Sequence, residues 1–447
     1  MNARFTVPLL LALIAAHVIL AIGFAVKTPW RTGGAVLINR SVEKDIGAPD
    51  ERQHANYIAR LIRGEGLPVF RADDPNLYEN YQSHQPPLYY ETANVWGRFL
   101  GVGSVDSRDD GLRLRALNIV IGAVGVAGVF FAAWWATGQE AAALTAAAFA
   151  ALVPMNLALS GAVSNDPMLI ALCTWALALM VLGVREGWTP ARTIGVGVLT
   201  GLALLTKTTA LALLPALLVA SLIRRPNLKA VAMVAIPLLI LSVPWFARNQ
   251  SLYGDPFAIR AFNNAFTQSA QKEMMVSQVI PHAQPGMNPE MAYWKDWVGF
   301  WTARSFVGVF GYMDVWMTQT GRLSGSLDQN RLYWVVLTVF GIGLLLGLRG
   351  FSEAKARGAM VVLAVFGLMV VGLFLRFNQQ YFQAQGRYLY PALSVWATGI
   401  GLGLSSWKKR PLVGVALLVL LLGGADALAL SRLDSEFALR IQAGQAQ

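Results

Sequence analysis

The chain has 447 residues, of which 55% are hydrophobic and 14% charged, and its formal net charge is +11. Soluble domains carry about 25% charged residues, so this composition excludes an ordinary soluble protein and favours one whose main solvent is lipid. The positive charge does not indicate a nucleic-acid partner, because Lys and Arg gather between apolar runs rather than in a basic patch. Cys173 is the only cysteine, which excludes an intrachain disulfide and a cysteine-based metal site.

Apolar segments recur along the whole chain, and a membrane helix needs about 20 mostly apolar residues. The candidates are 5–26, 113–135, 140–160, 166–184, 193–206, 209–223, 229–247, 332–348, 358–375, 389–405 and 411–430. The first is too long for a signal-peptide core, so we expect an uncleaved helix. Segments 193–206 and 209–223 are short and form either two spans or one helix kinked near Thr206–Thr209. The sequence predicts an all-α polytopic membrane protein with about 11 transmembrane helices.

The basic residues between the spans indicate the orientation, since short cytoplasmic loops are rich in Lys and Arg. With a cytoplasmic N-terminus, the cytoplasmic connections hold Arg185, Arg192, Arg224, Arg225, Arg349, Lys355, Arg357, Lys408, Lys409 and Arg410. The short connections on the other side hold Lys207, Arg376 and Arg387. We therefore expect a cytoplasmic N-terminus.

Two long polar segments, 27–112 and 248–331, then lie on the non-cytoplasmic side, with a short tail at 431–447. The first contains helical patterns at 50–63 and 87–100, and Tyr89, Tyr90 and Trp96 in the second pattern suit the headgroup level. The second segment contains an aromatic, interfacial stretch around Trp294, Trp297, Trp301 and Phe306. We expect one transmembrane domain, 1–430, with these two large loops.

The first candidate site follows Pro49, where Asp50, Glu51 and His54 fall within about one helical turn. Such a group suits cation binding or removal of a proton from an acceptor hydroxyl. The alternative is helix capping, because acids are favoured at a helix N-terminus.

Two further candidates lie at helix starts. His84 and Gln85 precede Pro86-Pro87 and would project at a helix N-terminus, which suits an anion; the alternative is an ordinary turn. Asp166, in Ser164-Asn165-Asp166-Pro167, would lie close to the membrane surface, and its alternative role is an N-cap.

Four basic residues lie near the non-cytoplasmic ends of spans, where the positive-inside rule disfavours them: Lys207, Arg248, Arg304 and Arg387, the last followed by Tyr388. A lipid-linked phosphate would explain them, because Arg grips phosphate bidentately and Lys binds it as a point charge. The alternative for each is snorkelling toward lipid headgroups.

Together these motifs resemble the glycosyltransferase C superfamily, which includes protein O-mannosyltransferases and the bacterial aminoarabinose transferase of lipid A. The resemblance is carried by PDERQHANYIARLIRGEGLPV (49–69), HQPPLYY (84–90), RNQSLYGDP (248–256), SFVGVFGYM (305–313) and QGRYLYP (385–391). It extends from about residue 45 to 395 and is greatest to an uncharacterised bacterial branch.

The resemblance implies an inverting glycosyltransferase of the bacterial inner (plasma) membrane. It would move a sugar from a polyprenyl-phosphate donor lipid to a periplasmic or cell-envelope acceptor, with a periplasmic active site. The acidic residue that acts as base or orients the acceptor corresponds to Asp50 or Glu51, and the second acid to Asp166.

This sequence departs from the lipid A branch at the turn before the Pro-Pro pair. That branch has a Lys that contacts donor phosphate, whereas this chain has Gln85, beside His84, so Lys207, Arg248 or Arg387 is expected to replace it. Some members of the superfamily bind a divalent metal ion, for which Asp50, His54 and Asp166 are the candidate ligands.

Three other functions stay open. One is an oligosaccharide ligase or polymerase that uses diphosphate-linked donors. Another is a lipid or solute transporter, which the scarcity of mid-helix charges disfavours, although Lys207 lies at a helix break. The third is a structural assembly partner. The sequence identifies neither the sugar nor the acceptor.

Overall fold

The computed structural model describes residues 3–36, 41–266, 271–318, 331–405 and 412–446, and most of them are helical. The bundle consists of α1 (Ala3–Lys27), α5 (Arg108–Thr137), α6 (Glu140–Leu152), α7 (Pro154–Ser160), α8 (Asp166–Glu186), α9 (Pro190–Leu204), α10 (Leu213–Ile223), α11 (Leu228–Tyr253), α17 (Arg331–Gly347), α18 (Ala354–Asn378), α19 (Leu393–Leu404) and α20 (Val413–Gln445). Short 3₁₀ segments adjoin it: η2 (Thr208–Ala212), η6 (Leu348–Phe351) and η7 (Gly386–Ala392).

The two long loops contain shorter elements. The first holds β1 (Gly34–Val36), β2 (Ser41–Glu43), α2 (Glu51–Ile62), α3 (Leu77–Asn80), η1 (Tyr81–His84) and α4 (Leu88–Phe99). The second holds α12 (Ile259–Ala265), α13 (Lys272–Met274), η3 (Met275–Val279), α14 (Ile280–Ala283), α15 (Pro289–Ala292), η4 (Tyr293–Gly299), α16 (Phe300–Val307), β3 (Val309–Phe310) and β4 (Val315–Trp316). Each strand pair, β1–β2 and β3–β4, is antiparallel.

Every predicted apolar segment contains a helix among the described residues, so the prediction of an all-α polytopic membrane protein is confirmed. Within the described part of the chain, seven helices are long and apolar enough to cross a membrane. An eighth span results if α6 and α7, bent by 60° at Val153, are counted together. Segments α9 and η2–α10 are shorter apolar helices.

The break near Thr206–Thr209 separates two antiparallel helices. Arg192, at the start of α9, donates to the carbonyl of Gly187, and Arg224, just after α10, donates to the carbonyl of Arg185. The start of α9 and the end of α10 therefore lie at the same end of the bundle, and the chain reverses direction at Lys207 between them.

Small residues let the central helices approach one another. Nearly every side chain of the alanine-rich α6 is buried. A Cβ added to Gly401 of α19 would lie 2.4 Å from the carbonyl oxygen of Ala142. Membrane helices commonly pack through such small residues, because lipid supplies no hydrophobic drive for helix association.

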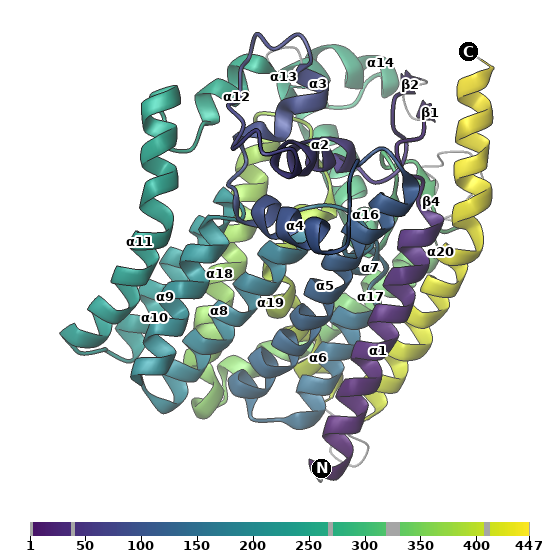
Figure 1. Cartoon of the computed structure of the whole chain (residues 1–447). Coiled ribbons are helices and arrows are strands. Elements are labelled where there is room, and N and C mark those ends of the chain that lie inside the picture. Colours follow the sequence, from purple (N-terminus) through teal and green to yellow (C-terminus); the bar gives the residue numbers. More distant parts are fainter. Residues whose placement is uncertain (1–2, 37–40, 267–270, 319–330, 406–411, 447) are drawn as a thin grey trace.

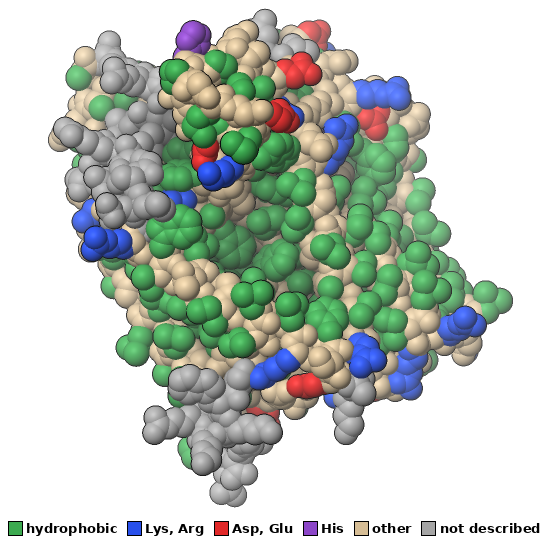
Figure 2. Space-filling view, turned by 180° about the vertical axis from the view of Figure 1, so that it is seen from behind, with side chains coloured by type: hydrophobic (Ala, Val, Ile, Leu, Met, Phe, Trp, Pro, Cys, Tyr) green, Lys and Arg blue, Asp and Glu red, His purple; other side chains and the backbone are tan. Residues whose placement is uncertain are grey.

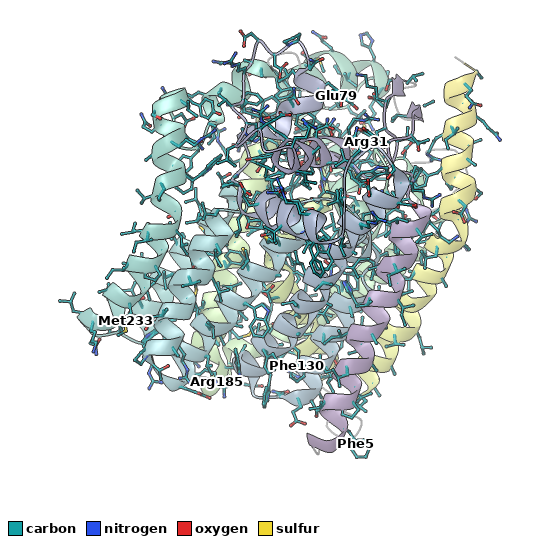
Figure 3. The ribbon with its side chains drawn as sticks, viewed as in Figure 1. Phe5, Arg31, Glu79, Phe130, Arg185 and Met233 are labelled. Atoms are coloured by element: carbon teal, nitrogen blue, oxygen red, sulfur yellow. The ribbon has the colours of Figure 1, made fainter. Side chains whose placement is uncertain are left out.

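Both long loops lie at one end of the bundle, which we call the loop end (Figure 1). The N-terminus lies at the other end, where Phe5 and Arg185 are found, whereas Arg31 and Glu79 lie at the loop end (Figure 3). Hydrophobic side chains cover the middle of the rear face, and this apolar band is hollowed near its centre, below the loop end (Figure 2). Of the predicted cytoplasmic residues, Lys408, Lys409 and Arg410 lie outside the described residues.

Helix α20 continues to Gln445, so residues 431–445 extend the last span as a helix. Buried Arg440 donates to the Asp314 carboxylate at 3.1 Å and to the Glu436 carboxylate at 3.0 Å. Asp314 immediately precedes β4. The end of α20 is thereby joined to the β3–β4 hairpin of the second loop.

The aromatic residues of α4 differ from the prediction. Tyr89 and Tyr90 are fully buried and pack against α2, with Tyr90 stacked on Tyr57 at 3.8 Å between ring centroids. The outward face of α4 carries Val95 and Phe99, which are exposed. The expectation that these tyrosines face the headgroups is wrong, because α2 offers them a buried apolar surface.

Candidate active site

Two carboxylate–cation pairs lie together at the loop end. Asp50 pairs with Arg387 at 2.5 Å, and Asp166 pairs with Lys207 at 2.6 Å. The Tyr388 ring is near both cations, with its centroid 5.3 Å from the Arg387 guanidinium carbon and 6.0 Å from the Lys207 ammonium. We call these four charged residues the paired-charge cluster.

Asp50 does not cap α2, although it occupies the N-cap position. Its backbone has a φ of 64°, in the left-handed region, and its side chain makes no capping hydrogen bond. A left-handed conformation is uncommon for residues other than glycine and is more frequent for Asp and Asn. The carboxylate faces Arg387 and accepts a 2.5 Å hydrogen bond from the Tyr81 hydroxyl. The capping alternative therefore does not describe Asp50.

The electrostatic surroundings keep Asp50 ionised. Burial opposes its charge, but Arg387, the Tyr81 hydroxyl and His54 outweigh that effect and lower the pKa of Asp50 to about 2. The Asp50 side chain is 27% exposed and the Arg387 side chain 9% exposed, so the carboxylate is the more accessible partner.

Close packing fixes Arg387. The preceding Gly386 donates its backbone N–H to the Ser305 hydroxyl at 2.7 Å, and a Cβ there would lie 2.3 Å from the backbone nitrogen of Phe306. Only glycine fits this approach of η7 to α16. Burial disfavours the charge of Arg387, but Asp50 raises the pKa of the guanidinium above its ordinary value. Its Nε has no hydrogen-bond partner among the described residues.

The second pair comes from two turns between spans. Asp166 is the first residue of α8, and its carboxylate accepts from Lys207. Lys207 has an extended backbone between α9 and η2. The adjacent Thr206 and Leu205 carbonyls accept from Asn165 and from the Leu88 backbone N–H, which attaches this turn to the first loop.

Glu51 lies beside Asp50 in the chain but faces a different partner. Its carboxylate accepts from Arg115 at 2.8 and 2.5 Å and from the Val163 backbone N–H at 2.7 Å. Arg115 also donates to the Thr28 and Pro29 carbonyls at 2.9 Å. Both side chains are 1% exposed. The pair thus joins the start of α2 to α5, to the end of α1 and to the turn before α8.

The two histidines are held in hydrogen bonds next to the cluster. His54 shares a 2.8 Å hydrogen bond with the Tyr90 hydroxyl, and burial lowers its pKa to about 4. His84 contacts the Tyr81 carbonyl through Nδ1 at 2.7 Å and the Gln85 amide through Nε2 at 3.0 Å, and burial lowers its pKa to about 4. Both imidazoles are therefore neutral near pH 7.

The other two basic candidates lie elsewhere. Arg248 donates to the Pro68 carbonyl at 2.8 Å and lies over the Trp245 ring. Arg304 is buried over the Phe300 ring at 3.6 Å and near Trp334. Neither contacts Asp50 or Asp166 in the described structure, so the structure brings Lys207, Arg387 and Tyr388 together without these two.

The proposed metal ligands do not form a metal site. Among the described residues, no group of three or more His, Cys, Asp or Glu side chains could hold an ion. Asp50 and Asp166 each face a basic side chain, and His54 uses Nδ1 on Tyr90. As arranged in the described residues, these three side chains do not form a site for a divalent cation.

Arg115 is the residue that sequence reasoning missed. It lies near the start of a predicted span, on the same side as Lys207. The criterion that selected Lys207 and Arg387, a basic residue on the side where such residues are disfavoured, would also have selected it.

Comparison with known proteins places this geometry in context. A family model described as "Predicted membrane protein (DUF2142)" matches residues 113–395, which include Asp166, Lys207 and Arg387 but not Asp50. No curated protein matches the chain.

Solved structures share the fold at low sequence identity. The oligosaccharyltransferase AglB of Archaeoglobus fulgidus, in complex with an inhibitory peptide and a dolichol-phosphate, is 15% identical with a TM-score of 0.56, covering 95% of this chain and 56% of its own. The structure of the same enzyme tethered with an acceptor peptide is also 15% identical, with a TM-score of 0.56; the match covers 95% of this chain and 55% of the archaeal chain. ArnT of Cupriavidus metallidurans is 18% identical with a TM-score of 0.41; the match covers 93% of this chain and 77% of the ArnT chain.

The chain thus spans little more than half the length of the archaeal enzyme. At 15% identity the likeness concerns the fold, and it confirms the resemblance to the glycosyltransferase C superfamily at that level. Because the family model covers more than half of the chain, this protein belongs to the DUF2142 family of predicted membrane proteins, and its bundle has a glycosyltransferase C fold.

Proposed function

We propose that this protein is an inverting membrane glycosyltransferase that moves a sugar from a polyprenyl-phosphate donor to an acceptor at the loop end. The observation that carries the proposal is the paired-charge cluster, which combines a partly exposed carboxylate with two cations. Such an arrangement suits attack by a hydroxyl and departure of a phosphate at one carbon.

The two cations are the proposed phosphate ligands. Arg387 can grip phosphate oxygens bidentately, and Lys207 adds a point charge near the same Tyr388 ring. Each is at present paired with a carboxylate, so a donor phosphate must compete with Asp50 and Asp166 for them. The dolichol-phosphate in the archaeal enzyme supports a lipid-phosphate ligand for this fold.

Asp50 is the proposed base. When the donor phosphate draws Arg387 away, the pKa of Asp50 rises from about 2 toward its ordinary value, and the carboxylate becomes a stronger base. The acceptor oxygen then bonds to the anomeric carbon and its proton passes to Asp50. The bond from that carbon to the phosphate oxygen breaks, and the phosphate leaves with the electron pair. Glu51, saturated by Arg115, has a positioning role in this scheme.

The apolar hollow of the rear face suits the lipid tail of the donor. It lies below the loop end on the face where α17 and α18 are found (Figure 2). A tail held there would leave its phosphate toward the loop end, where the paired-charge cluster lies.

The bilayer orientation follows the same proposal. Arg185, Arg192 and Arg224 lie at the end opposite the loops, as expected for the cytoplasmic side of a bacterial inner membrane. The loop end is then periplasmic. A donor with a diphosphate remains the second candidate, because the cluster offers two cations rather than one.

The test uses purified full-length protein in nanodiscs with polyprenyl-phosphate sugars. We expect release of polyprenyl phosphate, and Asp50→Asn should lower turnover by at least about 100-fold, within the usual range for removal of a general base. Asp73→Asn, an exposed acid of the same loop outside the cluster, is the matched control. Normal turnover by Asp50→Asn would contradict the assigned base.

A further inference from the structure

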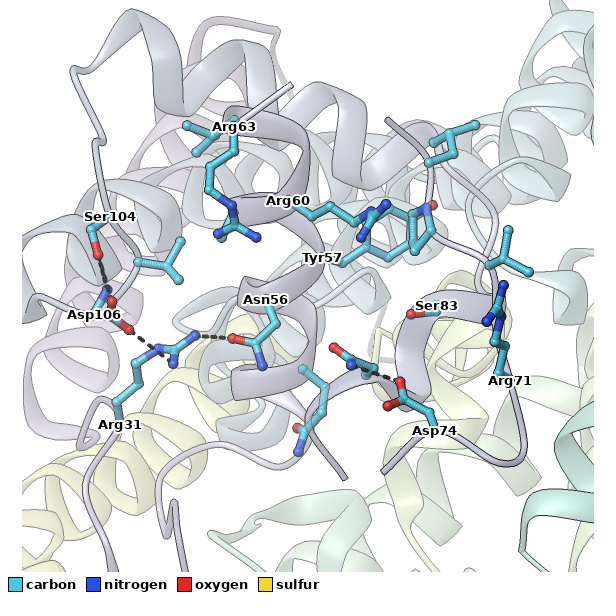
Figure 4. A pocket seen from close by; sticks show the side chains of 18 of the residues that line it. Arg31, Asn56, Tyr57, Arg60, Arg63, Arg71, Asp74, Ser83, Ser104 and Asp106 are labelled. Carbon is cyan, nitrogen blue, oxygen red and sulfur yellow. Dashed lines mark hydrogen bonds and ion pairs between the residues drawn. The ribbon is translucent and has the colours of Figure 1, made fainter. Parts of the chain in front are cut away.

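A cavity of about 620 Å³ opens in the first loop, away from the paired-charge cluster (Figure 4). Its wall is formed by Asn56 and Arg60 of α2, by Arg63 directly after that helix, by the segment around Arg71 and by the turn at Ser104–Asp106. None of the four cluster residues lines it. Its volume falls within the range of about 300–1,000 Å³ that is usual for small-molecule sites.

Basic side chains surround this cavity. Arg31, Arg60, Arg63 and Arg71 line it, whereas its acidic lining residues are Asp74 and Asp106. Arg31 pairs with Asp106 at 3.3 Å. The Arg71 side chain has no hydrogen bond or ion pair with any residue that the structure describes. Figure 4 shows Arg31 and Arg71 on opposite sides of the cavity and Arg60 and Arg63 above it. The cavity therefore attracts anions.

Glu65 neutralises two of the arginines only in part. It pairs with Arg60 at 3.3 Å and accepts from the Nε of Arg63 at 2.5 Å. Glu65 itself is not a lining residue. The terminal nitrogens of Arg63 have no partner in the described structure, and they are the atoms that form bidentate contacts with carboxylate or phosphate.

Two buried polar atoms at the wall have no partner among the described residues. They are the hydroxyl of Tyr57 and the Nε of Arg31. Tyr57 is 4% exposed, and its ring is held by stacking on Tyr90, so the position of the hydroxyl is fixed. Buried polar atoms normally have hydrogen-bond partners, so the unpartnered hydroxyl indicates a ligand with matching polar groups.

We propose that this cavity binds an anionic saccharide, that is, a sugar that carries a carboxylate or a phosphate. The arginines would hold the anionic group, and the unpartnered Tyr57 hydroxyl would contact a sugar hydroxyl. The site is separate from the paired-charge cluster, because Asp50, Asp166, Lys207 and Arg387 are all absent from its lining. The proposal does not depend on the glycosyl transfer proposed above.

The test measures binding rather than turnover. Full-length protein in detergent is titrated by calorimetry with glucuronate, glucose 6-phosphate, glucose and inorganic phosphate. Glucuronate and glucose 6-phosphate distinguish a carboxylate from a phosphate as the anionic group. We expect at least one of these two to bind at least tenfold more tightly than glucose and than inorganic phosphate.

Variants assign the binding to the cavity. Arg71→Gln and Arg63→Gln should each weaken the binding of the sugar acid by tenfold or more. Tyr57→Phe should also weaken this binding, although the stacked ring is retained. Arg113→Gln is the matched control, because Arg113 is about as exposed as Arg63 and lies at the start of α5, where it donates to the Gly101 carbonyl of the loop, but it does not line the cavity. Equal binding of glucose, equal binding of inorganic phosphate, unchanged binding in the Arg71 and Arg63 variants, or no binding of either sugar acid would each overturn the proposal.

Discussion

The guanidinium of Arg387 lies 2.5 Å from the carboxylate of Asp50, although 337 residues separate the two along the chain. The contact joins the start of α2 in the first loop to η7 just before α19. In the proposed mechanism it is also a contact that donor binding must break, because Arg387 is needed on the phosphate. This competition leads to a prediction that separates binding from catalysis.

Asp50→Asn should bind polyprenyl phosphate more tightly than the wild type while it loses turnover. The substitution removes the negative charge that competes for Arg387, so the lipid phosphate gains an unopposed cation. We expect roughly a tenfold gain, which corresponds to about 1.4 kcal/mol. The measurement is fluorescence-quench binding of polyprenyl phosphate in nanodiscs. Arg387→Gln is the opposing variant and should bind at least tenfold more weakly; weaker binding by Asp50→Asn would contradict the competition.

The Asp50–Arg387 pair should stabilise the protein at neutral pH and stop doing so in acid. Because the folded-state pKa of Asp50, about 2, lies below its ordinary value of 3.8, the contribution is present above pH 3.8 and disappears as the pH falls to about 2. The shift corresponds to about 2 kcal/mol. Unfolding of the wild type and of Asp50→Asn, followed from pH 6 to pH 2 in detergent, should therefore converge in that window. A stability difference between the two proteins that stays constant from pH 6 to pH 2 would argue against the Asp50–Arg387 ion pair.

Glu51→Gln should impair folding rather than chemistry alone. Removing one partner of a buried ion pair typically costs about 3–5 kcal/mol, and Arg115 would retain its charge at 1% exposure. We expect a lower melting temperature and a lower yield, measured by fluorescence-detected size-exclusion chromatography, whereas the exposed control Asp73→Asn should keep a wild-type yield. The double variant Glu51→Leu/Arg115→Met should recover much of the loss. A stable but inactive Glu51→Gln protein would instead move the base to Glu51.

Cysteine labelling should locate the loop end in the periplasm. The two sites to be replaced by cysteine are both exposed. Ser435 lies on the part of α20 that extends to the loop end, and Ser352 lies at the opposite end of the bundle. Cys173 is buried and should stay unlabelled. In intact cells an impermeant maleimide should label Ser435→Cys and spare Ser352→Cys, with both labelled after lysis. The reverse pattern would place the cluster in the cytoplasm.

The sequence predicted the helical bundle well because lipid imposes a simple rule on every span. It also selected Asp50, Asp166, Lys207 and Arg387 separately, from motifs and from charge placement. Which acid pairs with which cation could not be predicted, because no local pattern in 49–54 or 385–391 indicates a contact between residues 337 positions apart. The same limit applies to Glu51 and Asp50, which are neighbours in the chain but face different partners because Asp50 adopts a left-handed backbone.

The charge-placement rule also selected residues that do something else. Arg248 and Arg304 satisfy it, yet each lies over an aromatic ring away from the cluster. An arginine at the edge of a span can lower its energy on a tryptophan or phenylalanine as well as on a phosphate, and composition does not distinguish the two.

The junction at the end of α20 has a consequence for the order in which the protein assembles on the ribosome. The Arg440 side chain binds Asp314 next to the β3–β4 hairpin, and the Arg440 backbone lies against Gly34 of β1. One turn near the end of α20 therefore contacts both loops. Neither loop can reach its final position until residue 440 has been synthesised and α20 inserted. Under the proposed function, the site would therefore stay incomplete throughout most of translation, and a nascent chain could not consume donor lipid before its bundle is closed.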